Sequence, residues 1–310
     1  MANAYRMWAL QLAVGLLGAA ATAAALFVAL TRIDFSVPSP GELAAACQRY
    51  ALPQMRPVSV FVLVLGSLGV AAVALTARSV VRQLGAGRRL EHGLALLGTL
   101  PGAARAHVVD DDDPQAFCIG LLRPRVYVSR AALELLGEEE RAAVLAHEAH
   151  HARRRDPLRL LVGRALGEGL FFLPVVRRLA ERYAALAELA ADEAAAAQRG
   201  GRRALASALL AFDAHPSSAA VGIAPERVDC LLGQRARWEL PTVLLLGAVA
   251  TIAALMAITV RIAEATAHAT VGLPVLAAQA CMLAMALGPV LLGAMALLGG
   301  RRLTRARPAC

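Results

Sequence analysis

The sequence contains no lysine and few aromatic residues. Its 32 basic residues are therefore all arginines, and they lie in blocks between long apolar runs. Proteins that bind nucleic acid usually interleave basic with aromatic side chains or present a basic helix or groove, whereas only 4% of the residues here are aromatic. We therefore interpret the formal charge of +9 as a set of membrane topology signals and expect no direct binding of nucleic acid.

Cysteine is also scarce. The five cysteines are scattered along the chain and are never spaced as Cys-x-x-Cys. This pattern indicates neither a disulfide framework nor a zinc ribbon, so the cysteines are interpreted as free thiols.

Long apolar runs are what the chain has in abundance. With 58% hydrophobic residues and a mean hydropathy of +0.57, it is too apolar for an ordinary soluble enzyme. Four segments without charge are long enough to cross a hydrocarbon core of about 30 Å: residues 8–30, 58–77, 240–260 and 271–298. The first is longer than a typical cleavable signal core and is interpreted as an uncleaved anchor.

The arginine blocks predict how these four spans are oriented. The blocks follow the second span, precede the third and follow the fourth, and arginine-rich segments stay in the cytoplasm. The prediction is a multi-pass protein of the cytoplasmic (inner) membrane. It has an N-terminal anchor at residues 1–77, a cytoplasmic domain at 78–239 and a C-terminal anchor at 240–310 with a short basic tail. Both termini are then cytoplasmic.

A fifth apolar segment, residues 158–176, includes Arg159, Arg164 and Glu168. Each of these charges is expensive at the centre of a bilayer. We expect a helix that does not span, and the sequence leaves open whether it lies on the membrane surface or is buried in the domain core.

The cytoplasmic domain shows short strand patterns followed by helices. Strands are predicted at residues 107–109, 117–119 and 126–129, separated by turn signals. A helix begins after Gly137, with three glutamates in its first turn and three arginines in its last turn before Pro157. The chain is thus predicted to be a mainly α membrane protein, with four transmembrane helices and a cytoplasmic α+β domain that contains a small β-sheet.

This helix contains the motif His-Glu-x-x-His at residues 147–151. His147 and His151 are four residues apart, so both imidazoles face one side of the helix and can bind one zinc ion. Glu148 lies beside that face, where its carboxylate can serve as acid/base catalyst on a water molecule. His150 points to a flank and is interpreted as an accessory polar residue.

The third metal ligand is predicted at Glu188, in the helical run AELAADEAA. Glu188 and Asp192 are again four residues apart, so one carboxylate can bind the metal while the other orients a ligating histidine. Two histidines, one glutamate and an open position are typical of a catalytic zinc site. The three ligands can meet only if residues 158–176 do not cross the membrane.

The runs AFCIGLLRPRVYVS, EERAAVLAHEAHHARRRDP and AELAADEAA, flanked by membrane helices, resemble the BlaR/MecR family of antirepressor zinc metalloproteases. The resemblance covers residues 78–198 and implies a gluzincin-type domain with one zinc ion per chain. The residues that match the family's ligands, catalyst and supporting carboxylate are His147, His151, Glu188, Glu148 and Asp192.

The resemblance also implies a substrate, since members of this family cleave a cytoplasmic transcriptional repressor. In β-lactam-sensing members a penicillin-binding domain follows the last span. The present sequence ends at Cys310, soon after its fourth predicted span, so that sensor domain is not expected.

Two further expectations concern how substrate is bound. If the strand before the zinc helix is an edge strand, its residues Val126, Tyr127 and Val128 can pair with the substrate backbone. An oxyanion-stabilising residue is also expected, but Tyr183, His215 and nearby arginines cannot be ranked from sequence.

The leading hypothesis is a membrane zinc endopeptidase that hydrolyses a cytoplasmic regulatory protein in signal transduction, with that protein and the lipid bilayer as partners. An HtpX-like quality-control protease shares the zinc motif, although its third ligand usually lies beyond two further membrane helices. A non-catalytic receptor or scaffold is the other alternative, and the intact Glu148 argues against it.

Overall fold

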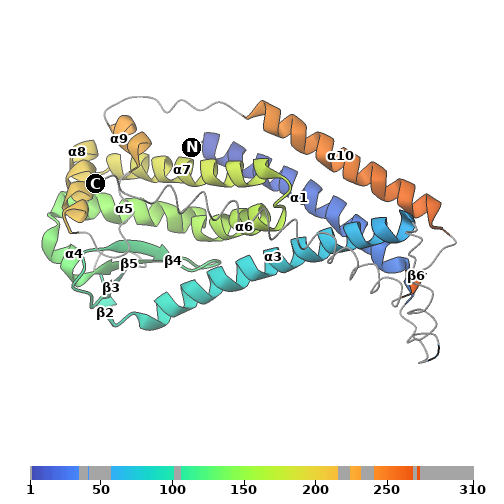
Figure 1. Ribbon diagram of the computed structural model, residues 1–310. Coiled ribbons are helices and arrows are strands. Elements are labelled where there is room, and N and C mark those ends of the chain that lie inside the picture. Colours follow the sequence, from blue (N-terminus) through green and yellow to red (C-terminus); the bar gives the residue numbers. More distant parts are fainter. Residues whose placement is uncertain are drawn as a thin grey trace, which may run out of the picture. The chain divides into compact units, whose positions relative to one another are not determined.

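A computed structural model describes residues 2–34, 41, 57–100, 106–215, 224–231, 241–267 and 271–272 (Figure 1). The helices are α1 (Ala2–Thr31), α3 (Pro57–Gly93), α4 (Arg130–Leu135), α5 (Glu138–Arg154), α6 (Asp156–Gly169), α7 (Pro174–Ala196), α8 (Gly201–Asp213), α9 (Pro225–Leu231) and α10 (Thr242–Ala265). The strands are β1 (Ile33–Asp34), β2 (Leu96–Thr99), β3 (Ala106–Val109), β4 (Ala116–Ile119), β5 (Arg125–Ser129) and β6 (Val271–Gly272). The described part of the chain is therefore mainly helical, as predicted.

The chain divides into two compact units. The first consists of Met1–Ala19 and Ala72–Ile252, and the second of Ala20–Ala71 and Ala253–Cys310. The first unit contains the sheet, the motif helices and every candidate site residue.

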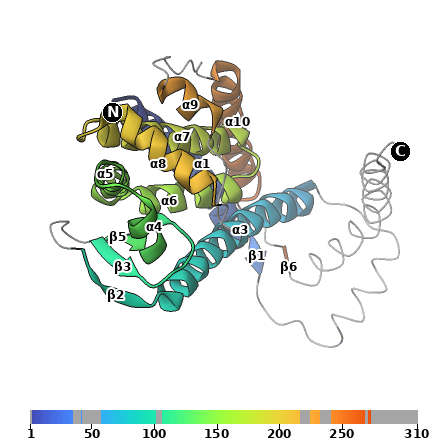
Figure 2. The same cartoon turned by 90° about the vertical axis from the view of Figure 1, so that its left-hand side faces the viewer.

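The sheet of the first unit has the strand order β2-β3-β5-β4. Strands β3 and β5 are parallel, and the other two pairs are antiparallel. Three of these strands match the three predicted ones, whereas β2 was not predicted. Helices α4 and α5 lie against this sheet (Figure 2).

The expectation that β5 is an edge strand is wrong. This strand lies between β3 and β4, so the backbone groups on both of its sides are already paired within the sheet. Its side chains Val126, Tyr127 and Val128 are buried in the core. Residues of β5 therefore cannot pair with a substrate backbone.

Helix α5 has well-defined ends. Its start is tied by the backbone N–H of Gly137, which donates to Oε2 of Glu140 over 2.8 Å. Its end comes where Arg155 adopts a left-handed conformation with φ of 54°. The chain then turns directly into α6, where Asp156 is buried and Pro157 lies in the first turn, a position that needs no backbone N–H.

Small side chains let the motif helices approach one another closely. A buried cluster joins α5, α7 and α8 through Ala143, Ala195, Ala204 and Leu205. Helices α5 and α7, which carry the predicted metal ligands, are also in direct contact. The alanine-rich composition of α7 therefore has a packing role.

The first turns of α1 pack on a second apolar cluster of the first unit. Its buried members are Leu170, Leu173, Val175, Val176, Leu179 and Ala248. Residues 158–176 are thus shared between α6, a turn and the start of α7, and they contribute to this core instead of forming one continuous helix.

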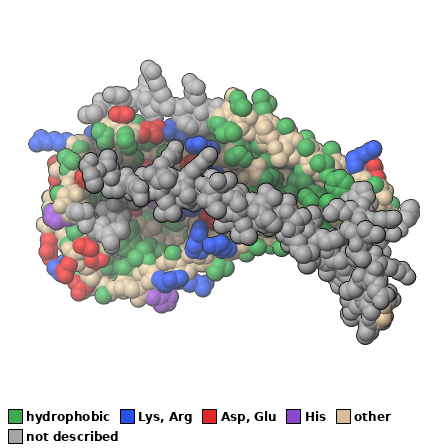
Figure 3. Space-filling model, viewed as in Figure 1, with side chains coloured by type: hydrophobic (Ala, Val, Ile, Leu, Met, Phe, Trp, Pro, Cys, Tyr) green, Lys and Arg blue, Asp and Glu red, His purple; other side chains and the backbone are tan. Residues whose placement is uncertain are grey.

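Three of the described helices are long and apolar enough to cross a membrane: α1, α3 and α10. They match the first three predicted spans, although α3 continues well past residue 77 to Gly93. The apolar residues Val243, Leu246 and Val249 of α10 are 80%, 71% and 62% exposed, which suits a lipid-facing helix. Figure 3 shows hydrophobic side chains on the surface in the region of α10. The predicted fourth span, residues 271–298, lies outside the described residues except for 271–272.

The second unit contains a parallel pairing between β1 and β6. Beside it, the guanidinium of Arg32 donates to the carbonyl oxygens of Ala263 and Ala267 at the end of α10, each over 3.3 Å. This cation therefore satisfies carbonyl groups that the end of a helix leaves without an intrahelical partner.

Candidate metal centre

Three side chains from two helices converge on one point of the first unit. The Nε2 atoms of His147 and His151, both on α5, lie 3.2 Å apart, and each lies 3.5 Å from a carboxylate oxygen of Glu188 on α7. In a tetrahedral zinc site with bonds of about 2.0–2.1 Å, neighbouring donor atoms are about 3.3–3.4 Å apart. The two 3.5 Å distances reach different oxygens of Glu188, so the two imidazoles and both oxygens of one carboxylate surround a space that suits a zinc-sized ion in donor type and approximate spacing.

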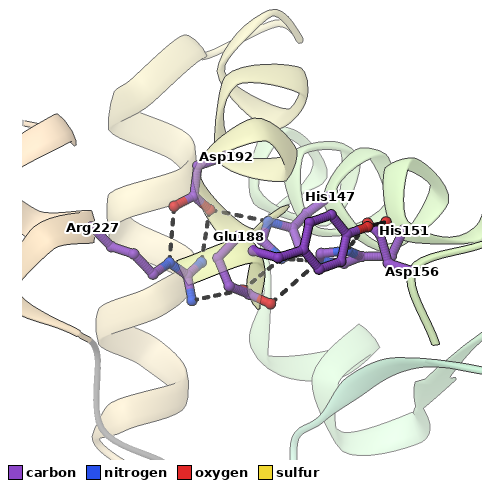
Figure 4. Close-up of polar contacts among 7 residues, drawn as sticks. His147, His151, Asp156, Glu188, Asp192 and Arg227 are labelled. Carbon is purple, nitrogen blue, oxygen red and sulfur yellow. Dashed lines mark hydrogen bonds and ion pairs between the residues drawn. The ribbon is translucent and has the colours of Figure 1, made fainter. Parts of the chain in front are cut away.

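Each histidine is held from behind by a carboxylate (Figure 4). Nδ1 of His147 lies 3.0 Å from Oδ1 of Asp192, and Nδ1 of His151 lies 2.8 Å from Oδ2 of Asp156. When Nδ1–H points at a carboxylate, the lone pair of Nε2 is left for a metal ion. The hydrogen bond to Asp156 thus fixes the orientation and tautomer of His151 for metal binding, and Asp192 lies within ion-pair distance of Nδ1 of His147.

A hydroxyl group holds Asp156 in turn. The hydroxyl of Tyr183, which is only 1% exposed, donates to Oδ1 of Asp156 over 2.6 Å. Each oxygen of Asp156 therefore has one partner, and the carboxylate cannot rotate away from His151 without losing one of the two contacts.

Arg227 of α9 reaches the other side of the centre. Its guanidinium donates from Nε and Nη2 to the two oxygens of Asp192 over 2.9 and 2.7 Å, and Nη1 lies 3.3 Å from Glu188. The neighbouring Glu226 accepts from Arg182 of α7 over 2.6 and 2.8 Å. Three ion pairs thus hold α9 against α7 beside the metal ligands. Figure 4 shows the two that Arg227 makes.

A cavity of about 330 Å³ opens onto the ligand atoms. Among its lining residues are the three predicted ligands, Glu148, Arg227, and Ala116, Phe117 and Cys118 of β4. Burial raises the pKa of Glu148, although His147 and His151 oppose the rise. A carboxylate with a raised pKa beside a metal position is a stronger proton acceptor than an ordinary glutamate.

Strand β4 borders this cavity and has β5 as its only neighbour among the described strands. Since the N–H of Ser129 donates to the carbonyl of Gln115, alternate residues such as Phe117 also direct their backbone groups toward β5. The backbone groups of Ala116 and Cys118 therefore face the open edge of the sheet, next to the ligands.

Comparison with known families decides the class of the protein. A family model described as BlaR1 peptidase M56 matches residues 5–228, which is most of the chain and includes every residue of the centre described above. The chain belongs to the BlaR1 peptidase M56 family. No curated protein and no solved structure matches it.

Membership of the M56 family makes the protein a membrane-associated peptidase, in agreement with its three apolar helices and its group of potential metal ligands. The resemblance to BlaR/MecR proteins expected from the sequence is thereby confirmed.

The charges of the M56 centre favour a cation. Burial lowers the pKa of His147, but Asp192 and Glu188 outweigh this effect and raise it to about 9. Burial likewise opposes ionisation of Glu188 and Asp192, yet their histidine and arginine neighbours keep both pKa values below the ordinary range. The carboxylates are therefore ionised at neutral pH and provide the negative charge that a divalent cation requires.

Two residues of this arrangement were missed by sequence reasoning. Asp156 was read only as part of the helix end RRRDP, and Arg227 as one member of an arginine block that signals topology. An aspartate beside a helix-ending proline, five residues after the second motif histidine, was the available signal for Asp156. For Arg227 no local signal exists, because α9 meets α7 only through tertiary packing.

The structure also separates the candidates for oxyanion stabilisation. Tyr183 already donates to Asp156, and His215 is exposed and contacts the carbonyl of Ala211. Among the arginines, Arg227 lines the cavity. His150 is buried but does not belong to the ligand group, in keeping with its interpretation as an accessory residue.

Proposed function

We propose that the protein is a zinc-dependent endopeptidase of the cytoplasmic membrane that cleaves a cytoplasmic regulatory protein. His147, His151 and Glu188 hold one zinc ion, and Glu148 is the acid/base catalyst. The observation that carries this proposal is the donor geometry, in which each of two histidine Nε2 atoms lies 3.5 Å from a different carboxylate oxygen of Glu188 while a carboxylate lies beside each rear nitrogen.

The side chains of the centre have different roles in the proposed peptide hydrolysis. A zinc ion held there supplies a Lewis acid that polarises the scissile carbonyl and activates water. Glu148 takes the proton from the attacking water and passes it to the departing amine, and its raised pKa makes it a stronger base than an ordinary glutamate. Asp156 and Asp192 keep the two imidazoles in place throughout.

Arg227 has a separate role in the proposed reaction. Its guanidinium lines the cavity and lies between Asp192 and Glu188, so it can donate a hydrogen bond to the carbonyl oxygen of the substrate as negative charge develops there. This assignment replaces Tyr183 and His215 as candidates for that role.

The substrate backbone is proposed to add to the open edge of β4. Ala116 and Cys118 present backbone donors and acceptors there, and main-chain pairing recognises an extended peptide of almost any sequence. This placement replaces β5, and it brings the substrate along the wall of the cavity that contains Glu148.

The experiment that tests the function compares the wild type with Glu148→Gln. Both proteins are expected to contain one zinc ion per chain by elemental analysis, whereas only the wild type cleaves. Equal proteolysis by the two proteins would remove the peptidase proposal, and zinc-free wild-type protein would remove the metal assignment.

The same pair of proteins identifies the substrate class. N-terminal proteomics of cells that contain either protein is expected to show one processed regulatory protein specific to the wild type. A broad set of processed membrane proteins would instead support the quality-control alternative.

A further inference from the structure

A second cavity lies in the first unit, lined by residues of α1, α6 and α7. Its volume is about 300 Å³, and its lining includes Gln11, Arg159, Gly163, Arg164 and Tyr183. None of these residues is a proposed metal ligand, and no role in the proposed reaction needs this cavity. Its volume is several times that of one water molecule, which occupies about 30 Å³ in the liquid.

Gln11 is the least expected residue of this lining. Its side chain is fully buried, and neither Nε2 nor Oε1 has a hydrogen-bond partner among the described residues. The amide fits only because residue 163 is a glycine, since a Cβ atom at this position would lie 2.7 Å from Nε2 of Gln11 and would clash with it. Buried amides are nearly always hydrogen-bonded, so this one calls for a ligand that both accepts and donates.

A second buried group in the same cavity also lacks a partner. Nη1 of Arg159 is buried and has no hydrogen-bond partner among the described residues, and Arg164 also lines the cavity. The two glutamates of the lining are paired, Glu168 with Arg82 and Glu181 with Arg177. The cavity therefore offers two arginines to an anion.

We propose that this cavity binds a phosphate group that carries a neighbouring hydroxyl. The phosphate oxygens accept from Arg159, Arg164 and Nε2 of Gln11, and the hydroxyl donates to Oε1 of Gln11. A glycerol phosphate unit has this chemistry, either as the headgroup of an anionic lipid or as a free molecule. Gln11 lies in the first turns of the candidate span Ala4–Thr31, which is where a lipid headgroup is available.

Tyr183 connects the cavity to the metal centre. Tyr183 lines the cavity together with Arg159, its hydroxyl donates to Asp156, and Asp156 contacts Nδ1 of His151. A ligand in the cavity thus contacts the tyrosine that supports Asp156 and, through it, His151. This consequence rests on the proposed function, whereas binding itself does not.

Trp8 provides a direct readout of binding. Its ring lies 5.6 Å from that of Tyr183, which lines the cavity, and the only other tryptophan of the chain is Trp238. The full-length protein with Trp238→Phe is placed in nanodiscs of phosphatidylcholine that contain increasing amounts of phosphatidylglycerol. A saturable change of Trp8 fluorescence is expected, and in pure phosphatidylcholine discs soluble glycerol phosphate is titrated as the second arm.

Variants decide whether the signal comes from this cavity. Gln11→Leu and Arg164→Gln are each expected to weaken binding about tenfold or more, because each removes a hydrogen bond to a charged group. The exposed Arg202→Gln on α8 makes the same charge change elsewhere and is expected to leave the curve unchanged. Saturation by the lipid alone identifies a headgroup site, and saturation by glycerol phosphate identifies a site for the free molecule.

The proposal is overturned if neither ligand changes the fluorescence, or if the wild type, Gln11→Leu and Arg164→Gln give one curve. All titrations are repeated with Glu148→Gln, which binds the ligand equally well if the site is independent of catalysis. The result therefore stands even if the peptidase proposal fails.

Discussion

Asp156 shows how one residue that is not itself a ligand can determine the metal site. It lies in the first turn of α6, and its two oxygens contact Nδ1 of His151 and the hydroxyl of Tyr183. Burial together with the Asp156 carboxylate raises the pKa of Tyr183, so its hydroxyl keeps its proton and remains the donor of this hydrogen bond. The position of Nε2 of His151 therefore depends on a carboxylate beyond the motif.

The first prediction is that Asp156→Asn lowers zinc affinity about 10–100-fold, the usual effect of removing a carboxylate behind a ligating histidine. Asparagine keeps the size of the side chain but not its charge, so the fold is expected to persist. Competition with a chelator measures the affinity. Tyr183→Phe removes only the second contact and is expected to have a smaller effect; an equal or larger loss in that variant would contradict the role given to Asp156.

The second prediction concerns the coupling between Arg227 and Asp192. Arg227→Met is expected to destabilise the protein by about 1.5–3 kcal/mol, because it leaves the buried Asp192 carboxylate without a bidentate partner. In an Asp192→Asn background the same change is expected to cost at least about 1 kcal/mol less. Chemical unfolding of the four proteins of this cycle measures the difference, and additive effects would show that the pair is not coupled.

At the scale of elements, strand β4 gives the third prediction. Cys118→Pro removes an N–H that faces the open edge, whereas the pairing of β4 with β5 uses the neighbouring residues. Cleavage is expected to fall at least about tenfold, because the substrate loses one main-chain hydrogen bond and meets the proline ring at the strand edge. The zinc content is expected to stay at one ion per chain.

Cys118→Ala is the control for this strand, because it keeps the backbone N–H and is expected to cleave normally. Burial, together with Glu148 and Asp156, raises the pKa of Cys118 to about 12, so the residue is a neutral thiol that the proposed reaction does not use. A large loss of activity in Cys118→Ala would show that the side chain and not the strand edge is needed.

The approach of α6 to α3 gives the fourth prediction. A Cβ atom at Gly169 would lie 1.9 Å from Oγ1 of Thr76, so Gly169→Ala is expected to destabilise the protein by about 1–3 kcal/mol. Gly87→Ala on α3 meets no atom within 4 Å and is expected to stabilise the helix by up to about 1 kcal/mol. Thermal unfolding of both variants checks this, and shifts of the same sign would contradict the packing argument.

At the scale of the whole molecule, features with a local sequence pattern could be predicted, whereas the order of the strands in the sheet could not. The four-residue spacing of His147 and His151, and that of Glu188 and Asp192, fixes which side chains share a helix face, so the sequence could indicate the ligand group. The position of β5 inside the sheet depends on how distant strands pair, and the place of Arg227 on how α9 docks on α7. Neither leaves a local pattern, so β5 was misassigned and Arg227 was overlooked.

The last prediction tests the orientation that the arginine blocks indicate. Gly41 and Gly87 both meet no atom within 4 Å, so a cysteine fits at either position. Gly87 lies among Arg78, Arg82, Arg88 and Arg89 and is predicted to be cytoplasmic, whereas Gly41 lies between the first two predicted spans and is therefore predicted to face outward. In variants without native cysteines, a membrane-impermeant maleimide is expected to label Gly41→Cys on intact spheroplasts but Gly87→Cys only after permeabilisation. The reverse pattern would place the metal centre outside the cytoplasm and exclude a cytoplasmic substrate.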